Sequence, residues 1–271
     1  DKPWGLLADD EEGWVDKIDT AASFRLGERF KVRVGIKTTA DKVFVREDWS
    51  TMNGICPEPE LLKDLISQEN IGAWRLRKAG TLKVLYTHEV RNGRRKPIEL
   101  SQWPKAEAYL LDHADVLKAR KYVSDAGRAW YEIWVPQDPA SWSRPKLVFP
   151  DISEGPRFYH DTSGRLVNGN CYWIPAMTTE QEPLLLLAQA VCNSRLMRKY
   201  HDLVFQNKLY AGRRRYFSQF IEQYPMPNPS SAAAQEIVKL VEEIHTTSSE
   251  GHAASLEARV DDLVEEAFGM L

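Results

Sequence analysis

Apolar residues occupy every second position of the segment from Phe30 to Ile36. This period of two predicts a strand with one buried face, and a second strand is predicted near Lys42–Val45. Residues Ile71–Arg77 and Thr81–Thr87 predict a pair of β-strands. Asn92-Gly93 predicts a tight turn, because both residues tolerate positive φ. We therefore expect this part of the chain to be rich in β-structure.

Helical spacing of apolar residues predicts two helices in the same half of the chain, a short one over Pro57–Ser67 and a longer one over Leu100–Tyr122. Beyond them, three β runs are separated by Pro, Ser, Asp and Gly residues, which favour turns. These runs are Trp130–Val135, Lys146–Phe149 and Asn170–Ile174. The alternation predicts a mixed, β-rich domain.

The pattern becomes helical from Gln181 onwards. Leu184–Val204 is long and strongly apolar, and a proline cluster at 225–229 marks a boundary. Two amphipathic, acidic helices are predicted after it, over Ser231–His245 and Ala253–Phe268. We therefore expect an α+β fold. Its parts are an acidic linker or docking segment at 1–21, a β-rich domain at 22–180 and a mainly helical subdomain at 181–271.

The composition is that of a globular protein, with 43% hydrophobic and 28% charged residues in 271. No stretch approaches the roughly 20 apolar residues of a transmembrane helix, so we expect no membrane partner. Cys56, Cys171 and Cys192 lie far apart in the sequence. This argues against a disulfide framework and for a reducing, cytoplasmic setting.

The net charge of −3 conceals a strong asymmetry. Residues 1–21 carry a net −5 and residues 235–271 a net −7, which leaves +9 on residues 22–234. The cations concentrate in two clusters, at 75–96 and 195–215. Lysine and arginine at this density are typical of proteins that neutralise phosphates of a nucleic acid. The alternative is that these clusters are solvated surfaces without a ligand.

Sequence motifs of common catalytic sites are absent. There is no Gly-x-Gly-x-x-Gly or Walker loop, no Cys-x-x-Cys or His-Glu-x-x-His, and no Gly-x-Ser-x-Gly. Pro150-Asp151 could begin a metal-dependent nuclease motif, but no Asp/Glu-x-Lys follows it closely. We therefore expect no catalytic residue, no metal and no cofactor in this chain, and a stand-alone hydrolase or nuclease is the least favoured reading.

Several segments resemble the C-terminal specificity region of gamma-class adenine-N6 DNA methyltransferases of the TaqI type. The same region occurs in fused type IIG restriction–modification enzymes. The resemblance is carried by Val34–Thr39 with Lys42–Val45, by Pro104–Tyr122, by Trp130–Trp134, by Arg144–Pro150, by Leu184–Asn193, by Tyr216–Pro227 and by Val260–Gly269. Each motif has low specificity by itself, but the order and spacing of the motifs make the resemblance specific.

The resemblance implies a target-recognition domain that binds double-stranded DNA. The family's methyl-donor fold and its Asn-Pro-Pro-Tyr loop are not found in this chain. It therefore implies a partner methyltransferase domain, upstream in the same parent chain or on a separate subunit, which binds S-adenosylmethionine. The parent activity would be site-specific adenine-N6 methylation, with or without a fused endonuclease. This chain would be non-catalytic.

The candidate DNA contacts combine both lines of reasoning. From the clusters come Arg213, Arg214 and Arg215 as phosphate or base contacts, Arg91, Arg94, Arg95 and Lys96 as a groove-probing hairpin tip, and also Arg195, Lys199 and Tyr216. From the resemblance come Lys37, Thr38 and Thr39 near a flipped base, and Arg120 and Lys146 at recurring family positions, with structural salt bridges as the alternative for the last two. The competing hypothesis is a protein-interaction module that holds a partner subunit through its terminal helices.

Overall fold

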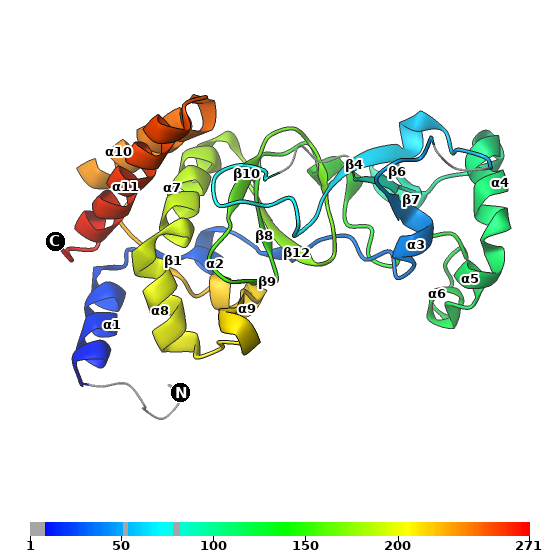
Figure 1. Cartoon of the computed structure of the whole chain (residues 1–271). Coiled ribbons are helices and arrows are strands. Elements are labelled where there is room, and N and C mark those ends of the chain that lie inside the picture. Colours follow the sequence, from blue (N-terminus) through cyan, green and yellow to red (C-terminus); the bar gives the residue numbers. More distant parts are fainter. Residues whose placement is uncertain (1–8, 51–53, 78–81) are drawn as a thin grey trace.

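Two hydrophobic cores organise the chain, which a computed structural model describes over residues 9–50, 54–77 and 82–271. One core lies beneath the terminal helices and the other beneath a hairpin and three short helices. Figure 1 shows the resulting elongated molecule. We call the part with α1 and α7–α11 the helical lobe, and the part with α3–α6 and β3–β7 the hairpin lobe.

A central antiparallel sheet joins the two lobes (Figure 1), in the order β10 (Tyr159–Asp161), β8 (Lys146–Pro150), β12 (Cys171–Pro175), β2 (Arg33–Val34). Strand β8 is buried along its whole length. Leu147 and Phe149 belong to the core of the helical lobe, whereas Val148 belongs to the other core. Alternate side chains thus enter different cores, which explains why this strand is a continuous apolar run. The strands predicted at Lys146–Phe149 and Asn170–Ile174 are confirmed.

The hairpin lobe contains a second four-stranded sheet and a separate hairpin. The sheet has the order β11 (Leu166–Val167), β4 (Leu62–Ile66), β5 (Lys83–Leu85), β3 (Val45–Arg46). The hairpin joins β6 (His88–Arg91) to β7 (Arg94–Pro97). Asn92 and Gly93 have φ values of 54° and 70°, which confirms the predicted turn.

Several local predictions in the hairpin lobe were wrong. Pro57–Ser67 is not a helix: after η1 (Pro59–Leu61) it forms β4, because its backbone pairs with β5 on one side and β11 on the other. The single helix predicted over Leu100–Tyr122 is broken into η2 (Leu100–Gln102), α4 (Pro104–Asp112), α5 (Ala114–Lys118) and α6 (Lys121–Asp125). His113 and Arg120 leave the helical region of φ/ψ at the breaks.

Three predicted strands are also reduced. Residues Asp41–Phe44 form helix α3 just before β3. Between Ile71 and Arg77 the backbone makes one isolated bridge, Ile71 to Leu76, and Trp130–Val135 is a turn whose last residue bridges to Lys37. The strand predicted over Thr81–Thr87 begins outside the described residues and is confirmed as β5. Tertiary contacts override local β-propensity at these places.

The helical lobe is built from α7 (Glu182–Asn193), α8 (Arg195–Phe205), α10 (Ala232–Thr246) and α11 (Glu250–Ala267). The long helix predicted over Leu184–Val204 is interrupted because Ser194 caps α8, accepting a hydrogen bond from the Met197 amide. Short elements complete the lobe: β1 (Phe24–Arg25) with β14 (Pro225–Met226), β9 (Ile152–Ser153) with β13 (Arg214–Arg215), α2 (Leu26–Arg29) and α9 (Ser218–Ile221).

Helix α1 (Asp9–Ala21) occupies most of the segment predicted to be a linker or docking strap. It is helical because Val15 and Ile18 are buried on one face in the core of the helical lobe. Tyr200 on α8 donates a hydrogen bond of 2.7 Å to Asp19. The acidic segment is therefore docked along α8 from Asp9 onwards.

All three cysteines are free. In the described part of the chain, no helix has both the length and the apolar composition needed to cross a bilayer. The mixed α+β class is confirmed.

Candidate nucleic-acid interface

Arg120 lies inside the hairpin lobe, not on its surface. Its guanidinium donates to the carbonyl oxygens of Leu117, Thr38, Trp130 and Glu132, at 2.6–3.2 Å. These bonds fasten the Thr38–Thr39 loop and the 130–132 turn to the break between α5 and α6. Thr38 is also buried and its hydroxyl bonds to Asp41. Both side chains are buried and cannot contact DNA, so the prediction that Arg120 and Thr38 bind DNA was wrong.

Lys146 is likewise a structural residue. Its ammonium is fully buried, 2.8 Å from Asp161 across the β8–β10 pair, and donates to the Trp142 carbonyl at 2.7 Å. Burial lowers the pKa of Lys146, and the Asp161 charge opposes that shift. A cation held this way cannot reach a phosphate. The alternative prediction, a structural salt bridge, is confirmed for Lys146. Arg120 also has a structural role, but its partners are backbone carbonyl oxygens.

The Arg213–Arg215 run divides into one inward and two outward side chains. Arg214 is buried because β13 pairs with β9, and its guanidinium makes a two-point contact with Asp202, with Nη2–Oδ2 at 2.7 Å. It also donates to the Glu154 carbonyl. Burial favours the neutral form of Asp202, but hydrogen bonds and charges from Arg214 and Lys208 lower its pKa. Arg214 therefore belongs to the fold.

Arg213 and Arg215 face outwards on either side of Arg214, as alternate residues of a strand do. Arg213 is exposed, and Arg215 lies over the Phe217 ring, 5.0 Å from its centroid. Tyr216 is only 2% exposed, and its ring stacks on His201 at 4.9 Å. The ring of Tyr216 is therefore unavailable for stacking on a base.

Arg195 and Lys199 lie on the surface of α8 but have partners within the helical lobe. Arg195 forms ion pairs with Asp261 at 3.1 Å and Asp262 at 3.3 Å. Lys199 lies over the Trp14 ring at 4.2 Å. Exposed pairs of this kind contribute little to stability, so both cations can exchange partners.

The hairpin tip carries a group of exposed cations. Arg94 and Lys96 are exposed and have no ion-pair partner among the residues that the structure describes. Arg91 pairs with Glu89 and Glu99, and Arg95 donates to the Gln137 carbonyl at 3.0 Å. Two cations of the hairpin, Arg94 and Lys96, are thus available for a ligand, whereas Arg91 and Arg95 are held by contacts within the protein.

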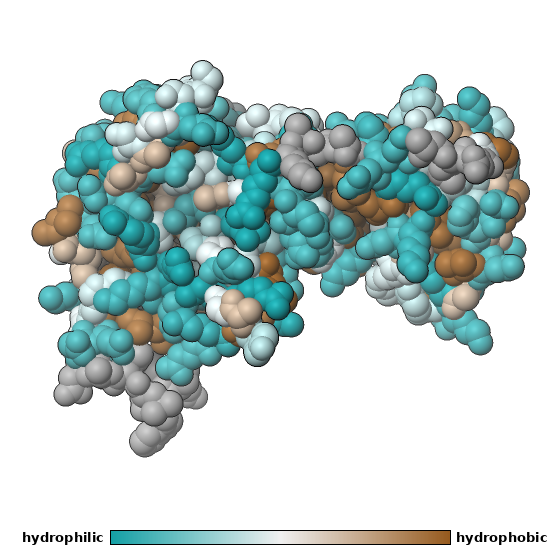
Figure 2. All heavy atoms as spheres, in the orientation of Figure 1, coloured by the Kyte–Doolittle hydropathy of each residue, from teal (hydrophilic) through white to brown (hydrophobic). Residues whose placement is uncertain are grey.

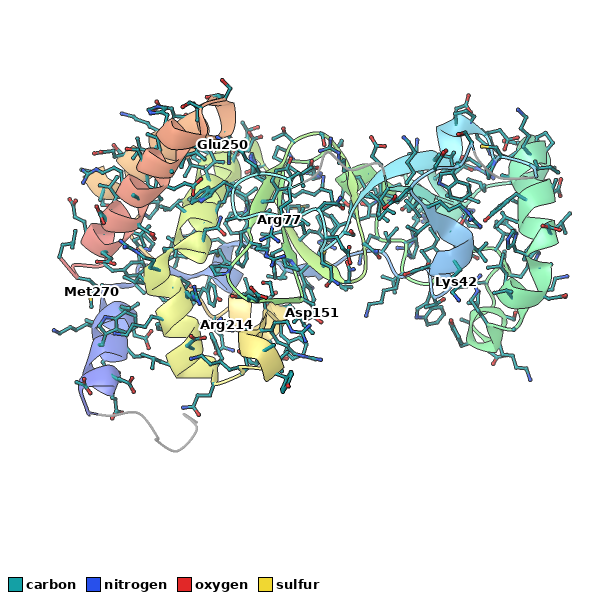
Figure 3. All side chains as sticks on the ribbon, in the orientation of Figure 1. Lys42, Arg77, Asp151, Arg214, Glu250 and Met270 are labelled. Atoms are coloured by element: carbon teal, nitrogen blue, oxygen red, sulfur yellow. The ribbon has the colours of Figure 1, made fainter. Side chains whose placement is uncertain are left out.

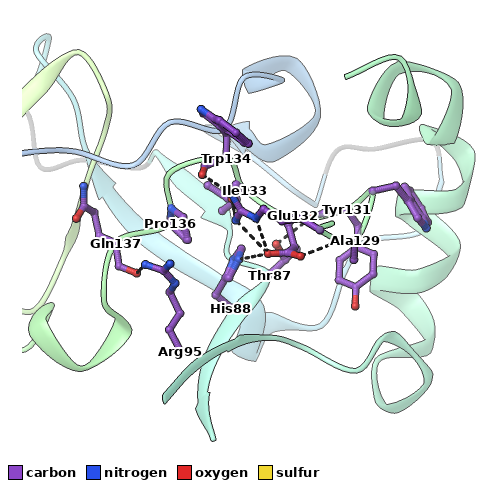
Figure 4. Close-up of polar contacts among 12 residues, drawn as sticks. Thr87, His88, Arg95, Ala129, Tyr131, Glu132, Ile133, Trp134, Pro136 and Gln137 are labelled. Carbon is purple, nitrogen blue, oxygen red and sulfur yellow. Dashed lines mark hydrogen bonds and ion pairs between the residues drawn. The ribbon is translucent and has the colours of Figure 1, made fainter. Parts of the chain in front are cut away.

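A buried polar network fixes the base of this hairpin (Figure 4). The Glu132 carboxylate accepts hydrogen bonds from His88 at 3.2 Å, from Arg128 at 3.0 Å and from the Ala129 amide at 2.7 Å. Burial favours the neutral acid, but these bonds outweigh it and lower the pKa of Glu132 to about 2. Burial also lowers the pKa of His88. The hairpin is therefore presented on a rigid support.

The loop 206–213 projects a tyrosine from the helical lobe. Tyr210 is 91% exposed, and Gln206, Ala211 and Gly212 have positive φ. Such a conformation costs about 1 kcal/mol for a residue with a Cβ. Asn207 holds the base of the loop, accepting from His201 at 2.9 Å and donating to the Arg215 carbonyl at 2.6 Å.

The sequence analysis did not select three arginines that the structure brings together. Arg77, Arg157 and Arg198 line one surface cavity of about 300 Å³. Arg77 and Arg198 lie in the two basic clusters, which was the available sign, whereas Arg157 is isolated in the sequence. Figure 3 places Arg77 over the central sheet, on the side that faces α7. We call this cavity the arginine pocket.

The lower edge of the molecule is hollowed between the two lobes (Figure 2). Asp151 and Lys42 lie on opposite sides of this hollow (Figure 3). Lys37 is exposed on the segment that connects the lobes, and its charge and that of Arg215 both act on Asp151. Lys42 on one side, and Lys37 and Arg215 near Asp151 on the other, therefore lie around a concave edge. Thr39 is exposed beside Lys37, at a φ of 58°.

Within the described ranges, no group of three or more His, Cys, Asp or Glu side chains is arranged to hold a metal ion.

No family model matches the chain. It is 40% identical over 272 residues to the type II methyltransferase M.BanIII of Aneurinibacillus aneurinilyticus, covering 99% of this chain and 47% of that protein. Its homologues are type II methyltransferases. M.BstVI of Geobacillus stearothermophilus is 23% identical, covering 79% of this chain and 36% of its own length. M.PaeR7I of Pseudomonas aeruginosa is 24% identical, covering 83% and 37%. The chain spans less than half the length of these relatives.

Two solved structures share the fold. The type IIL restriction–modification enzyme MmeI, solved in complex with DNA, superposes with a TM-score of 0.63 and 13% identity, covering 92% of this chain and 34% of MmeI. The type IIG restriction endonuclease BpuSI superposes with a TM-score of 0.51 and 13% identity, covering 96% and 33%. At this identity the likeness concerns the architecture alone.

Proposed function

We propose that this chain is the DNA target-recognition region of a type II adenine-N6 methyltransferase, similar to the C-terminal region of the TaqI type. It binds double-stranded DNA in the cytoplasm and contributes no catalytic residue. Methyl transfer from S-adenosylmethionine is carried out by a separate domain of the parent chain or by a partner subunit. MmeI, which shares the fold, was solved in complex with DNA, and this supports the DNA binding that we propose.

The main support for the proposal is the position of five cations that form no ion pair within the described residues. Arg94 and Lys96 project from one lobe, Arg213 and Arg215 from the other, and Lys37 lies between them. Each of the two outward pairs is fixed by a rigid support, the Glu132 network or the β9–β13 pair. Phosphate contacts supply affinity and set the register, while arginines at the tips can contact base edges.

Two further groups belong to the proposed interface. Tyr210 would stack on a base or a sugar, because its ring is exposed and flanked by Arg213. Arg195 and Lys199 would exchange their weak surface contacts for phosphates when DNA is bound. Arg91 and Arg95 position the hairpin tip.

Charge reversal tests the proposal. Binding of a mixed-sequence duplex of about 30 base pairs is measured by fluorescence anisotropy at about 50 and 200 mM salt. We expect Arg213→Glu/Arg215→Glu and Arg94→Glu/Lys96→Glu each to weaken binding more than tenfold. The matched control, Lys17→Glu/Lys239→Glu, changes the same charge on exposed positions of α1 and α10 and should bind within about twofold of the wild type.

Selection from a randomised duplex library distinguishes sequence-specific base contacts from non-specific phosphate contacts. Phosphate contacts weaken binding uniformly, whereas loss of a base contact relaxes preference at one position. We expect the hairpin variant to alter the selected sequence. Absence of duplex binding by the wild-type chain at low salt, or charge-reversed variants that bind as the wild type does, would overturn the proposal.

A further inference from the structure

Three segments distant in sequence each place an arginine at the arginine pocket. Arg77 follows the Ile71–Leu76 bridge, Arg157 precedes β10, and Arg198 lies on α8. The rest of the lining is Ala73, Glu154, Gly155 and Pro156. The small residues leave room between the guanidinium groups for a ligand.

The pocket has an excess of positive charge. Glu154 is the one acid in its lining, and within residues 54–77 and 82–271 it forms no ion pair with any of the three arginines. Burial and the Arg77 charge lower the pKa of Arg157, while Glu154 opposes the shift. Like charges held together in a partly buried site are unfavourable unless an anion lies between them.

The arrangement is held rigidly by one amide side chain. Asn193, at the end of α7, donates to the Ala73 carbonyl at 2.7 Å and to the Phe158 carbonyl at 2.9 Å, and accepts from the Phe158 amide at 2.9 Å. It therefore ties the segments that carry Arg77 and Arg157 to the start of α8. The backbone positions of the three arginines are therefore preorganised, and ordering the exposed Arg77 and Arg198 side chains is the remaining cost of binding a ligand.

A second observation concerns Tyr216, which does not line the pocket but lies within the electrostatic reach of two of its arginines. The Tyr216 side chain is 98% buried by its 2% exposure, and its hydroxyl has no hydrogen-bond partner within the described structure. Burial raises the pKa of Tyr216, and among the charges that act on it Arg214 and Asp202 come first, followed by Arg198 and Arg157 of the pocket. A buried donor without an acceptor is costly, and a water molecule that bridges it to an anion in the neighbouring pocket would supply one.

We propose that Arg77, Arg157 and Arg198 form a binding pocket for a single phosphate group of the DNA backbone. The inference rests on the proposed function and adds a defined phosphate anchor to it. The planar guanidinium fork matches phosphate oxygens, and several forks around one phosphate fix its position as well as its charge. This anchor would set the register in which the hairpin tip and the 206–213 loop meet the duplex.

The test compares two doubly substituted proteins in the full chain. Arg157→Gln/Arg198→Gln removes two pocket charges, and Lys17→Gln/Lys239→Gln removes two charges elsewhere. In the mixed-sequence duplex assay, we expect the pocket variant to bind about 10- to 100-fold more weakly at 100 mM salt. The slope of log K against log salt should fall by about 0.9, which corresponds to one phosphate. The control should keep the wild-type slope.

A second arm distinguishes DNA from free phosphate. Inorganic phosphate, compared with chloride at equal ionic strength, should raise the Tm of the wild type and of the control but not that of the pocket variant. Arg157→Lys/Arg198→Lys keeps the charge and loses the fork, so it should retain the wild-type salt slope with weaker affinity. This variant also guards against misfolding of the glutamine variant.

A pocket variant with wild-type affinity and salt slope would overturn the inference and leave the proposed function standing. A wild-type chain that binds no duplex, yet shows the pocket-dependent rise of Tm with phosphate, would overturn DNA as the source of the phosphate and the proposed function with it.

Discussion

Helix α8 borders two arginine-rich regions that accommodate positive charge in opposite ways. Near its C-terminal end, Asp202 holds Arg214 in a two-point contact and also pairs with Lys208. About one turn earlier, Arg198 faces Arg77 and Arg157 without any such carboxylate contact. The cations of the first region are part of the fold. Those of the second increase local repulsion, which the proposed phosphate ligand would relieve.

The comparison corrects the idea that density of cations marks a DNA contact. Arg214 lies in the densest run of the sequence and is buried, whereas Arg157 stands alone and lines a pocket. What distinguishes them is a direct ion pair with a carboxylate, which Arg214 has with Asp202 and Arg157 lacks among the described residues. The following predictions test this distinction.

The largest effect is expected from Asp202→Asn. The substitution leaves Arg214 buried without its counterion, which should lower the free energy of unfolding by about 3 kcal/mol. Urea denaturation at neutral pH measures it. Asp262→Asn, which removes an exposed partner of Arg195, is the matched control and should change stability by less than about 0.5 kcal/mol. Equal effects of the two substitutions would remove the contrast.

Acid should destabilise the same end of α8 in a separate window. Burial lowers the pKa of His201 to about 4, and the same holds for His245 on α10. Between pH 6.5 and about 4 the unfolded chain binds protons that the folded protein excludes, so stability is lost as the pH falls. Each of the two histidines should lower the free energy of unfolding by up to about 3 kcal/mol over this range.

Urea denaturation at four pH values between 7 and 4 checks this expectation. His201→Gln can still bond to Asn207 but cannot titrate, so it should show a flatter dependence on pH. An unchanged slope in that variant would show that His201 does not contribute. The lowered pKa of Asp202 places the loss of its ion pairs at more acidic pH, which separates the two contributions.

How much of this could be predicted from sequence depends on the range of the contacts. The turn at Asn92-Gly93, the apolar run of β8 and the helices α10 and α11 follow from patterns within a few residues, and they were confirmed. Residues Pro57–Ser67 formed a strand instead because its partners, β5 and β11, are remote in sequence.

The candidate site was less predictable for the same reason. The sequence does not show that β13 pairs with β9 and so buries Arg214 between two outward arginines. Nor does it show the four carbonyl oxygens that surround Arg120. The arginine pocket requires Asn193 to hold two distant segments together. Arg94, Lys96, Arg195, Lys199 and the outward Arg213 and Arg215 could be selected from local pattern, because they lie in the basic clusters of the sequence.

A smaller effect, on duplex affinity, is expected at the 206–213 loop, which follows the C-terminal end of α8. Tyr210→Ala removes a ring that contacts little of the protein, so the stability should not change. If the ring stacks on DNA, duplex affinity should fall by about 1 kcal/mol, roughly fivefold. Tyr122→Ala, a partly exposed tyrosine of the hairpin lobe, is the control. An equal affinity for Tyr210→Ala and the wild type would remove this residue from the interface.

The smallest effect, with the opposite sign, is expected for stability at the arginine pocket. Arg157→Gln removes repulsion from Arg77, so in the absence of phosphate the free energy of unfolding should rise by up to about 0.5 kcal/mol. The gain should shrink when salt is raised from about 50 to 500 mM, because a partly exposed repulsion is screened. Urea denaturation at both salt concentrations measures it. A loss of more than about 1 kcal/mol would show that Arg157, like Arg214, stabilises the fold. The two regions along α8 would then not differ in whether their arginines are free to bind a ligand.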